Sequence, residues 1–352
     1  MAMGAEVELQ QGARLLVRLP NWVGDVLFCT PSLAALRRAR PDLRVTALVR
    51  PSVLPAVEGL PFVDEVLTLS GTTPGRTLAE ARKLRALGFH AALLFPKGFR
   101  EALLVRLAGI PVRIGLATDR RRGLLTRPVP FTREDWRRHH VDQFARVLSP
   151  LGVFLAGEGM AFPVGTADRE AAEALLRACG VEGPFAVLHP GASKRPRAWH
   201  PERFAEVARG LSARGGLAVV LVGTAAESEL CEAVRAGAPE AVSVAGKTDL
   251  KSMAALLEGA SLFLGSDSGP MHLAAAAGAP VVAVFGPGAP GKTAPYVPAR
   301  RFRIVYTAHP CSPCRQAFWK ECRPSPSGKP PCIEGVHSAS VLAACLELLD
   351  SK

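Results

Sequence analysis

The sequence predicts an α/β protein made of two Rossmann-like domains, each built on a parallel sheet. Short apolar segments of strand length alternate with longer segments of helical periodicity through most of the chain. The strand segments are continuously apolar, which is typical of parallel sheets covered by helices on both faces. The alternation pauses near residue 150 and restarts after residue 180. A chain of 352 residues also exceeds one average domain of about 100–200 residues, so two domains are expected.

The first domain is predicted to span residues 1–165. Its first strand, Arg14–Leu19, is ended by Pro20-Asn21, and an apolar helix follows from about Asp25 to Ala39. Loops are predicted at Gly71–Gly75 and at the basic Asp119–Arg127. The other predicted elements are strand Arg44–Val49, helix Ser52–Gly59, strand Glu65–Leu69, helix Thr77–Leu87, strand His90–Phe95, helix Phe99–Leu107, strand Val112–Gly115 and helix His139–Leu151.

The second domain is predicted to span residues 166–335. It opens with a polar-faced helix at the join, and the strand–helix alternation then restarts. Residues 336–352 form a final helix, which we expect to pack back on the first domain. The predicted elements are helix Thr166–Cys179, strand Phe185–His189, helix Pro201–Arg214, strand Leu217–Gly223, helix Ala226–Ala236, strand Ala241–Val244, helix Asp249–Glu258, strand Ser261–Gly265, helix Pro270–Ala277, strands Val281–Phe285 and Arg303–Tyr306, and helix Ser338–Leu349.

The composition indicates anionic partners. The formal net charge is +12, which favours nucleotide diphosphates, phosphorylated glycans or an anionic membrane surface. Basic residues are spread along the chain and only 6% of residues are aromatic, so we expect no nucleic-acid partner. No segment is long and apolar enough to cross a bilayer, and the N-terminus lacks the apolar core of a signal peptide. We expect a cytoplasmic monomer, peripheral at the inner face of the cytoplasmic membrane.

A strand–turn–helix unit, ASLFLGSDSGPMHLAAAAGAPVVAVFGP, spans residues 260–287. Asp267 or Ser268 can cap its helix, and Pro270 suits the first turn because it has no amide hydrogen to leave unpaired. The free N–H groups of such a helix start favour phosphate, and the carboxyl end of a parallel strand is where ligands bind. We expect this turn to hold the nucleotide of an activated sugar, with His272 in contact with it. Asp267 also occupies the nucleophile position of a nucleophile elbow, but no matching base is evident.

Residues Gly286–Thr293 satisfy both G-x-x-x-x-G-K-T and G-x-G-x-x-G. Both motifs require a helix to begin at once, because the phosphate lies on the helix N-terminus. Pro295 and Pro298 follow instead, and proline in a helix interior costs about 3 kcal/mol. A rigid Pro/Gly loop is therefore preferred over a P-loop.

Two polar segments offer further candidates. Asp25 lies at the first strand–helix junction, after a glycine that permits close approach, and on spacing alone it is equally an N-cap or a site residue. Lys194, Arg195 and Arg197 lie in a loop between a strand and a helix, where they either clamp a diphosphate or are solvated.

Four cysteines gather near the C-terminus, and the other four are scattered in apolar surroundings. Cys311, Cys314, Cys322 and Cys332 match a four-thiolate structural zinc site in number, with less regular spacing than two C-x-x-C pairs. Free thiols and disulfides are the alternatives, although clustered cytosolic cysteines are more often metal or redox sites than disulfides.

Four ordered segments resemble glycosyltransferase family 9, the lipopolysaccharide heptosyltransferases, and most of all the heptosyltransferase II branch. They are LPNWVGDVLFCTPSL, FPKGFREALLVRLAGIPVRIG, LHPGASKRPRAWHPERFAEVA and SLFLGSDSGPMHLAAAAGAPVVAVFGP. The resemblance covers nearly the whole chain. It implies a GT-B fold, with two Rossmann-like domains facing a central cleft. It also implies metal-independent, inverting transfer of a sugar from a nucleotide-sugar donor, typically ADP-heptose, to a lipopolysaccharide-core-like glycolipid.

The resemblance also assigns roles to residues. Asp25 matches the general base of the Gly-Asp motif. The turn Asp267-Ser268-Gly269 with His272 matches the donor-binding D-S/T-G-x-x-H pattern, and Glu227 matches a glutamate that contacts the ribose. Gly191, Lys194 and Arg197 lie in the donor-binding loop, where the family has a lysine before Trp-Pro. This chain has Arg197-Ala198-Trp199-His200-Pro201 instead, so either Lys194 or Arg197 is expected at the diphosphate.

Basic residues of the first domain, among them Lys97, Arg100 and Arg120, are expected to bind a phosphorylated acceptor, although solvated loops are the alternative. No cofactor is expected for catalysis. Three other functions remain open at this point: a sugar-nucleotide epimerase of the same architecture, a P-loop protein using Gly286–Thr293, and a nucleotide-sugar sensor.

Overall fold

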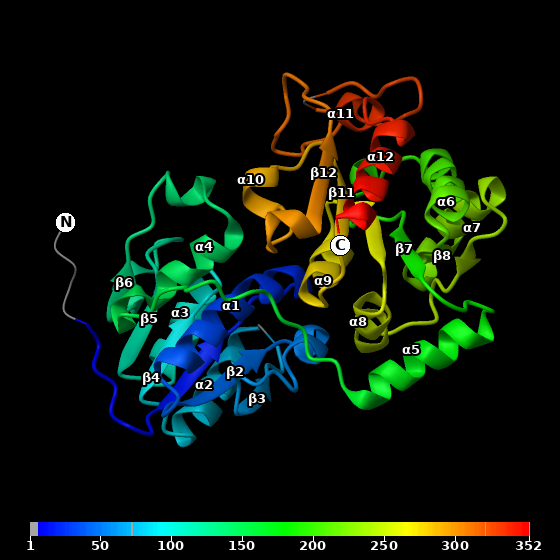
Figure 1. Ribbon diagram of the computed structural model, residues 1–352. Helices are drawn as coiled ribbons and strands as arrows, with labels where there is room; N and C mark the ends of the chain where they lie inside the picture. Colours follow the sequence, from blue (N-terminus) through cyan, green and yellow to red (C-terminus); the bar gives the residue numbers. More distant parts are fainter. Residues whose placement is uncertain (1–5, 72, 321, 352) are drawn as a thin grey trace. The chain divides into compact units, whose positions relative to one another are not determined.

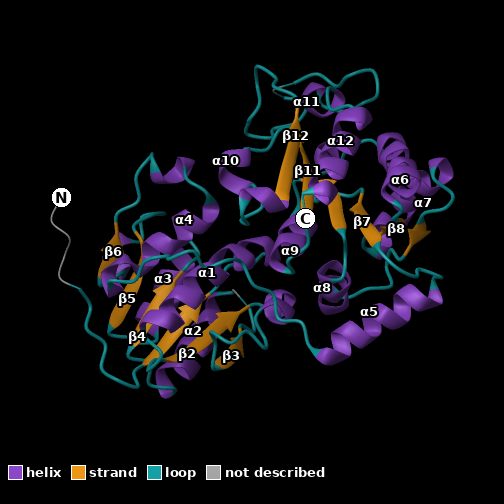
Figure 2. Cartoon of the chain, in the orientation of Figure 1, coloured by secondary structure: helices purple, strands orange, loops and turns teal. Residues whose placement is uncertain are grey.

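The structure is a computed structural model that describes residues 6–71, 73–320 and 322–351. The chain divides into two compact units, Met1–Pro163 and Val164–Lys352 (Figure 1). Each unit contains one six-stranded sheet in which every paired strand is parallel, with helices around it (Figure 2). The predicted fold class, two Rossmann-like α/β domains, is therefore confirmed.

The sheet of the first unit has the strand order β3-β2-β1-β4-β5-β6. Its strands are β1 (Arg14–Arg18), β2 (Arg44–Val49), β3 (Glu65–Thr68), β4 (Ala91–Leu94), β5 (Val112–Leu116) and β6 (Arg127–Val129). The helices are α1 (Val23–Ala39), α2 (Pro74–Ala86), α3 (Phe99–Leu107) and α4 (His140–Ala145), with 3-10 turns at Pro51–Ala56, Arg122–Leu124, Asp135–Arg137 and Arg146–Leu151.

The sheet of the second unit has the order β12-β11-β10-β7-β8-β9, which is the same winding. Its strands are β7 (Phe185–His189), β8 (Ala218–Leu221), β9 (Val242–Ser243), β10 (Leu262–Ser266), β11 (Val281–Phe285) and β12 (Phe302–Tyr306). The helices are α5 (Thr166–Ala178), α6 (Pro201–Gly215), α7 (Ser228–Gly237), α8 (Leu250–Glu258), α9 (Gly269–Ala276), α10 (Pro290–Thr293), α11 (Pro331–Glu334) and α12 (Ser338–Asp350), with 3-10 turns at Arg195–Arg197, Ala225–Glu227 and Ala299–Arg301.

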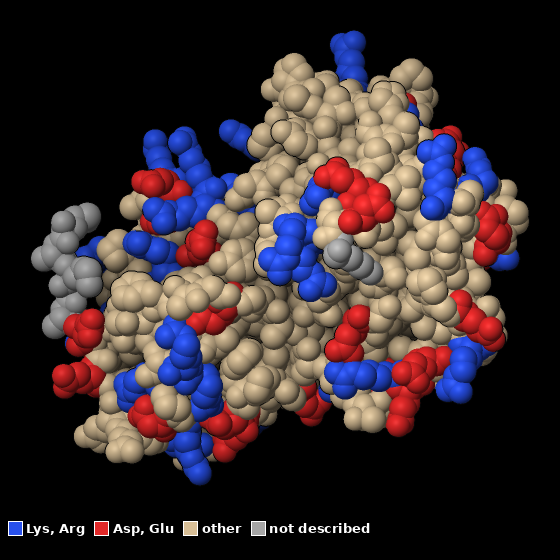
Figure 3. Space-filling model, viewed as in Figure 1, with Lys and Arg blue, Asp and Glu red and all other residues tan. Residues whose placement is uncertain are grey.

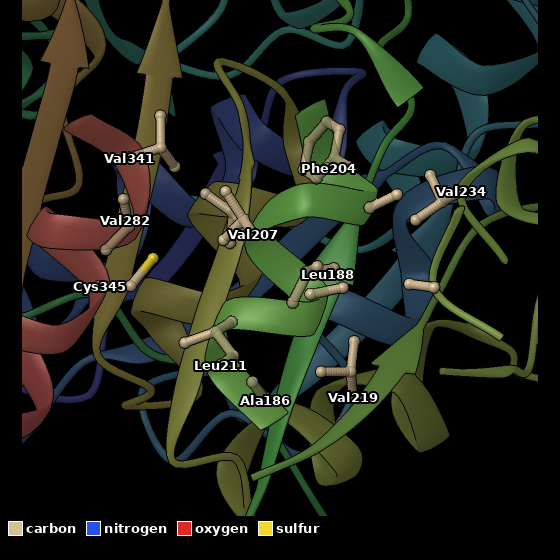
Figure 4. Packing of buried hydrophobic residues seen from close by; sticks show 14 of the residues in the cluster. Ala186, Leu188, Phe204, Val207, Leu211, Val219, Val234, Val282, Val341 and Cys345 are labelled. Carbon is tan, nitrogen blue, oxygen red and sulfur yellow. The ribbon is translucent and has the colours of Figure 1, made fainter. Parts of the chain in front are cut away.

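The second core is centred on α6. This helix turns Phe204, Val207 and Leu211 toward the sheet, and side chains of β7, β8 and β11 meet them (Figure 4). The last helix, α12, adds Val341 and Cys345 to the same cluster. Helix α12 therefore lies in the core of the second unit and does not form a separate segment.

Most predicted elements are present, and the differences have local causes. The predicted basic loop Asp119–Arg127 ends where the edge strand β6 begins, and no strand is predicted there. The second residue of β6 is Pro128, which an edge strand tolerates since one side of its backbone needs no ladder partner. The helix predicted at His139–Leu151 is α-helical only to Ala145 and continues as a 3-10 helix that contains Pro150. Two prolines likewise make Pro51–Ala56 a 3-10 helix.

Candidate active site

The candidate residues of each unit lie at the same kind of position. In both sheets the strand order reverses direction between two neighbouring strands, β1 and β4 in one and β7 and β10 in the other. Ligands of doubly wound sheets bind beyond the carboxyl ends of the strands at this switch point. Asp25 follows β1 and Lys97 follows β4, whereas Arg197 follows β7 and Asp267 follows β10. These four sequence-predicted residues therefore lie at two switch points, one in each unit.

The turn after β10 is buried and carries unused polar groups. Asp267, Ser268 and His272 are only 5%, 6% and 6% exposed. Ser268 is the N-cap of α9 but makes no side-chain capping bond, and its buried Oγ has no hydrogen-bond partner among the described residues. An unsatisfied buried group costs about 1–3 kcal/mol. Together with the N–H groups of the first turn of α9, this hydroxyl forms a surface suited to a phosphate.

The Asp267 carboxylate is held by Arg197. Nη2 of Arg197 lies 2.6 Å from Oδ2 of Asp267 and also donates to the main-chain oxygen of Asp267. Thr293 Oγ1 donates to Oδ1 at 3.4 Å. Burial raises the pKa of Asp267 above its usual value, and the charge and hydrogen bond of Arg197 act against that rise. The carboxylate is thus an anchor of the turn, because it ties the loops after β7 and β11 to β10.

The two candidate cations for the diphosphate differ in their surroundings. Arg197 forms an ion pair with Asp267 through Nη2, and its buried Nε has no hydrogen-bond partner among the described residues. Lys194 is exposed, and its Nζ lies 6.0 Å from the centroid of the Phe318 ring. Lys194 pairs with no carboxylate in the part of the chain that the structure describes. Lys194 is therefore the cation whose charge is not paired with a carboxylate among the described residues, whereas the position of Arg197 is fixed by its ion pair with Asp267.

The loop that imitates a P-loop packs around Asp267. Its helix, α10, has four residues, so it lacks the helix that a P-loop phosphate site requires. A Cβ at Gly288 would lie 2.1 Å from Oδ2 of Asp267, so only glycine fits at this position. The prediction of a Pro/Gly loop is thus right in outline, with one helical turn inside it, and the P-loop hypothesis is not supported.

A second polar cluster lies at the ends of β7 and β8. Glu227 Oε2 accepts hydrogen bonds from the backbone N (2.8 Å) and Oγ1 (2.9 Å) of Thr224, and its Oε1 lies 3.5 Å from Nε2 of His189. The hydrogen bond from His189 is the main reason that the pKa of Glu227 falls to about 2. A Cβ at Gly191 would lie 2.0 Å from Oε1 of Glu227. Gly191 and Glu227, both predicted at the donor, are therefore in direct contact.

In the first unit, Asp25 is the third residue of α1. Trp22 is the N-cap, so the alternative that Asp25 caps the helix is wrong. The carboxyl group is partly buried, and this burial raises the pKa of Asp25, whereas the positive charge of Lys97 lowers it. A carboxylate whose pKa is raised by desolvation is a better proton acceptor than a solvated one, which is what a general base requires.

Lys97 occupies a cage of three aromatic rings. Its Nζ lies 4.2 Å from the ring centroid of Trp136, 4.9 Å from that of Phe131 and 5.7 Å from that of Phe144. It also donates a hydrogen bond of 2.6 Å to Oε1 of Gln143. These contacts compete with the predicted role of Lys97 in acceptor binding.

The other basic residues of this region separate into exposed and buried ones. Arg100 and Arg120 are exposed, and their role at the acceptor stays a prediction. Arg121 is fully buried and donates to three carbonyl oxygens, those of Leu116, Pro96 and Gly98. Burial lowers its pKa to about 10. The run of three arginines from 120 to 122 is therefore not one solvated cluster, because its middle member supports the loops after β4 and β5. On the face shown in Figure 3, basic and acidic side chains are interspersed.

The four clustered cysteines are free thiols, so none of them forms a disulfide with another described residue. Cys332 is buried, and this burial is the main reason that its pKa rises to about 11, with smaller contributions from Cys311 and Cys314. The backbone N of Gln316 donates to Sγ of Cys314 at 3.2 Å. Among the residues that the structure describes, no three His, Cys, Asp or Glu side chains are arranged to hold a metal ion. The predicted zinc site is therefore not preformed.

Several residues of the two sites were not predicted. His189 and Thr293 contact the predicted acids, and Gln143 contacts Lys97. Arg18 is 1% exposed and reaches from the end of β1 to Oδ1 of Asn21 at 2.5 Å. Each of these residues contacts another side chain of the site, which the sequence does not show. For His189 and Arg18, the position at the end of a strand is the one signal that could have suggested a place in the site.

Comparison with known proteins agrees with the geometry. The chain is 28% identical over 275 residues to lipopolysaccharide heptosyltransferase 3 of Escherichia coli K12, covering 75% of this chain and 79% of that protein. It is 26% identical over 313 residues to lipopolysaccharide heptosyltransferase 2 of the same organism, covering 84% and 89%.

Two solved structures share the fold. A glycosyl transferase family 9 protein from Veillonella parvula DSM 2008 matches with a TM-score of 0.86 and 24% identity over 99% of this chain and 100% of that one. The structure of E. coli ADP-heptose lps heptosyltransferase II matches with a TM-score of 0.76 and 23% identity over 96% and 98%.

Two parallel doubly wound sheets, each with polar residues at its switch point, define the fold class, GT-B. The model of glycosyltransferase family 9 (heptosyltransferase) matches residues 77–322, and the chain belongs to this family. It is therefore a glycosyltransferase, and the epimerase alternative is not favoured. None of the described helices has the length and apolar character needed to cross a membrane.

Proposed function

We propose that this enzyme transfers heptose from ADP-heptose to a lipopolysaccharide-core-like glycolipid, with inversion at the anomeric carbon. The single observation that carries the proposal is the buried turn at Asp267–Gly269. There the unpartnered Ser268 hydroxyl and the start of α9 offer a site for a diphosphate. The relatives named above are heptosyltransferases, which supports heptose as the sugar.

The residues take the following roles in this proposal. Asp25 accepts the proton of the acceptor hydroxyl while that oxygen bonds to the anomeric carbon and the bond from this carbon to the diphosphate oxygen breaks. The charge that develops on the departing ADP is stabilised by Lys194 and by the N–H groups of α9. Glu227, beside Gly191, accepts hydrogen bonds from the ribose hydroxyls, because its low pKa keeps it ionised.

The test is a transfer assay with ADP-heptose and a purified heptose-bearing inner-core glycolipid, read by mass spectrometry. Wild type should add one heptose to the glycolipid. Asp25→Asn should lower turnover by about 10²–10⁴-fold and leave ADP binding, measured by calorimetry, nearly unchanged. Glu58→Gln removes an exposed carboxylate on the same unit and should transfer normally. Turnover by Asp25→Asn at the wild-type rate would contradict the base assignment, and isomerised ADP-heptose without acceptor would indicate an epimerase.

The acceptor and the setting of the reaction are part of the proposal. The net charge of +12 and the exposed Arg100 and Arg120 support a phosphorylated glycolipid at an anionic membrane surface. We infer a cytoplasmic monomer that associates peripherally with that surface. Co-sedimentation with phosphatidylglycerol vesicles, lost in Arg100→Met/Arg120→Met, tests the contact; unchanged sedimentation would contradict it.

No metal is needed in the proposed transfer, so turnover should persist in a chelator. The clustered cysteines suggest a separate, structural role for zinc: Cys311, Cys314, Cys322 and Cys332 supply four thiols of the right chemistry within one segment. Because they are not arranged as a ligand set, zinc would have to draw them together. One equivalent of zinc in purified protein, lost in Cys311→Ser, would support this. Zinc-free protein with four reactive thiols would contradict it.

A further inference from the structure

The cage around Lys97 is built more firmly than a surface lysine requires. Two of its rings, Phe131 and Trp136, contact each other edge to face at 4.9 Å, and the third, Phe144, contacts the buried Phe95 at 6.1 Å. A cation over an aromatic face is attracted by the negative potential of the ring, and more strongly when it is desolvated. The ammonium group is thus confined from several sides.

The segment that carries the cage is itself anchored by a buried carboxylate. Asp135 is 3% exposed and accepts hydrogen bonds from the backbone N (2.8 Å) and Oγ1 (2.9 Å) of Thr132. Arg138 and Arg146 each lie 3.7 Å from its Oδ1. Gln143, which accepts from Lys97, is in turn fixed because its Nε2 donates to the Arg138 carbonyl at 2.8 Å. The position of the Lys97 charge is therefore set by the fold of residues 131–146.

This fixed charge lies at the same switch point as Asp25. β1 and β4 pair in register, Arg18 with Leu94, so the residues that follow them emerge at one edge of the sheet. The field of Lys97 acts on two groups of α1: it opposes the burial that raises the pKa of Asp25 and of Cys29, one helical turn further on. Other titratable or charged groups near this helix are His139 and His140, which contact Phe28 edge to face at 5.4 Å. Arg18 lies at the end of β1 and pairs with Glu101 at 3.9 Å.

We propose that Lys97 is a positioning residue for the transfer reaction: its caged ammonium group supplies the fixed positive charge that keeps the Asp25 carboxyl ionised and ready to accept a proton. This rests on the proposed function, because it assumes that Asp25 is the base. Without a fixed cation, a desolvated carboxylate takes up a proton at a higher pH and is lost as a base at the acid end of the working range. An exposed lysine would be less effective, since water and salt would screen its charge.

The variants are Lys97→Met, which keeps most of the length of the side chain and removes its charge, and Lys97→Arg, which restores the charge. In Lys97→Met the acid limb of the pH profile for kcat should move upward by about one unit, with the plateau at high pH largely retained. Lys97→Arg should move it back toward wild type. Trp136→Leu, which opens one wall of the cage, should move it part of the way. Arg133→Met removes an exposed cation from the same segment and should leave the acid limb in place.

A second readout does not depend on turnover. In protein labelled with ¹³C at aspartate carboxyl carbons, the signal missing from Asp25→Asn identifies Asp25, and its titration midpoint should rise in Lys97→Met. If folded Lys97→Met has the same Asp25 titration midpoint and the same acid limb of the pH profile as wild type, the proposal is overturned. A uniform loss of activity without a shift, which is what a purely structural role produces, would also overturn it. If Asp25→Asn retains full turnover, the base assignment fails, and the titration still decides whether Lys97 controls Asp25.

Discussion

Arg197 Nη2 lies 2.6 Å from Oδ2 of Asp267, and this ion pair connects the loop after β7 to the turn after β10. The side chains are only 17% and 7% exposed, so both charges are largely removed from water. A buried pair of this kind contributes little relative to apolar residues, but the loss of one partner leaves an uncompensated charge. The pair therefore acts mainly by holding the turn after β10 in one arrangement.

The first prediction concerns that pair. Arg197→Met should lower the free energy of unfolding by about 3–5 kcal/mol, because the buried Asp267 loses its counter-charge. The double variant Arg197→Met/Asp267→Asn should be less destabilised than the sum of the single variants, because no buried charge remains. Urea denaturation at pH 7 measures all four proteins. If the losses in the free energy of unfolding of the two single variants add up in the double variant, Arg197 and Asp267 are not coupled and the prediction is wrong.

The second prediction concerns the glycine that faces the same carboxylate. Gly288→Ala should lower stability by about 1–3 kcal/mol and weaken ADP binding, because its Cβ would lie 2.1 Å from an Asp267 oxygen that Arg197 holds in place. Gly291→Ala is the matched control in the same loop, since a Cβ there meets nothing within 4 Å. Thermal melting and ADP calorimetry compare the two. Equal stability and equal ADP affinity of Gly288→Ala and Gly291→Ala would contradict the prediction, because they would show that the Asp267 side chain can move away from the added Cβ.

The third prediction separates the two cations of the loop after β7. Lys194→Met should raise KM for ADP-heptose with little change in thermal stability, because the exposed lysine has no carboxylate partner among the described residues and is free for the diphosphate. Arg214→Met removes an exposed cation at the other end of α6 and serves as the control for net charge. A KM for ADP-heptose equal to that of wild type would leave Arg197 as the remaining candidate.

The fold could be predicted because its signals are local. Continuous apolar strands, a proline or glycine at most ends and alternation with helices fix two parallel sheets, and the same pattern placed Asp25 and Asp267 at strand ends. The prediction failed for shorter elements that contain a residue atypical of their secondary structure. Pro128 is atypical of a strand, so the edge strand β6 was not predicted. Pro290 begins the short helix α10, which the neighbouring prolines argued against.

The partners within each site could not be predicted from spacing. Arg197 and Asp267 are 70 residues apart in the sequence, and nothing in either segment shows that their side chains point toward each other. Arg121 looks like its exposed neighbours Arg120 and Arg122 until its three carbonyl acceptors are seen. Sequence pattern assigns residues to a switch point, whereas the pairing of charges depends on tertiary packing.

The fourth prediction concerns pH and Glu227. Its pKa is lowered to about 2, so it binds fewer protons in the folded than in the unfolded protein, and the resulting stability is present above its unfolded pKa of about 4.5. Glu227→Gln should therefore be less stable than wild type at pH 7, by about 1–2 kcal/mol after allowance for a side chain that is 25% exposed. The gap should narrow as the pH falls from about 4.5 toward 2, because the wild-type carboxylate then takes up its proton. Urea denaturation of both proteins between pH 6 and 3 measures this change, with the exposed Glu229→Gln as the control. A gap that stays constant over this range would show that the contacts with His189 and Thr224 do not depend on the charge of Glu227.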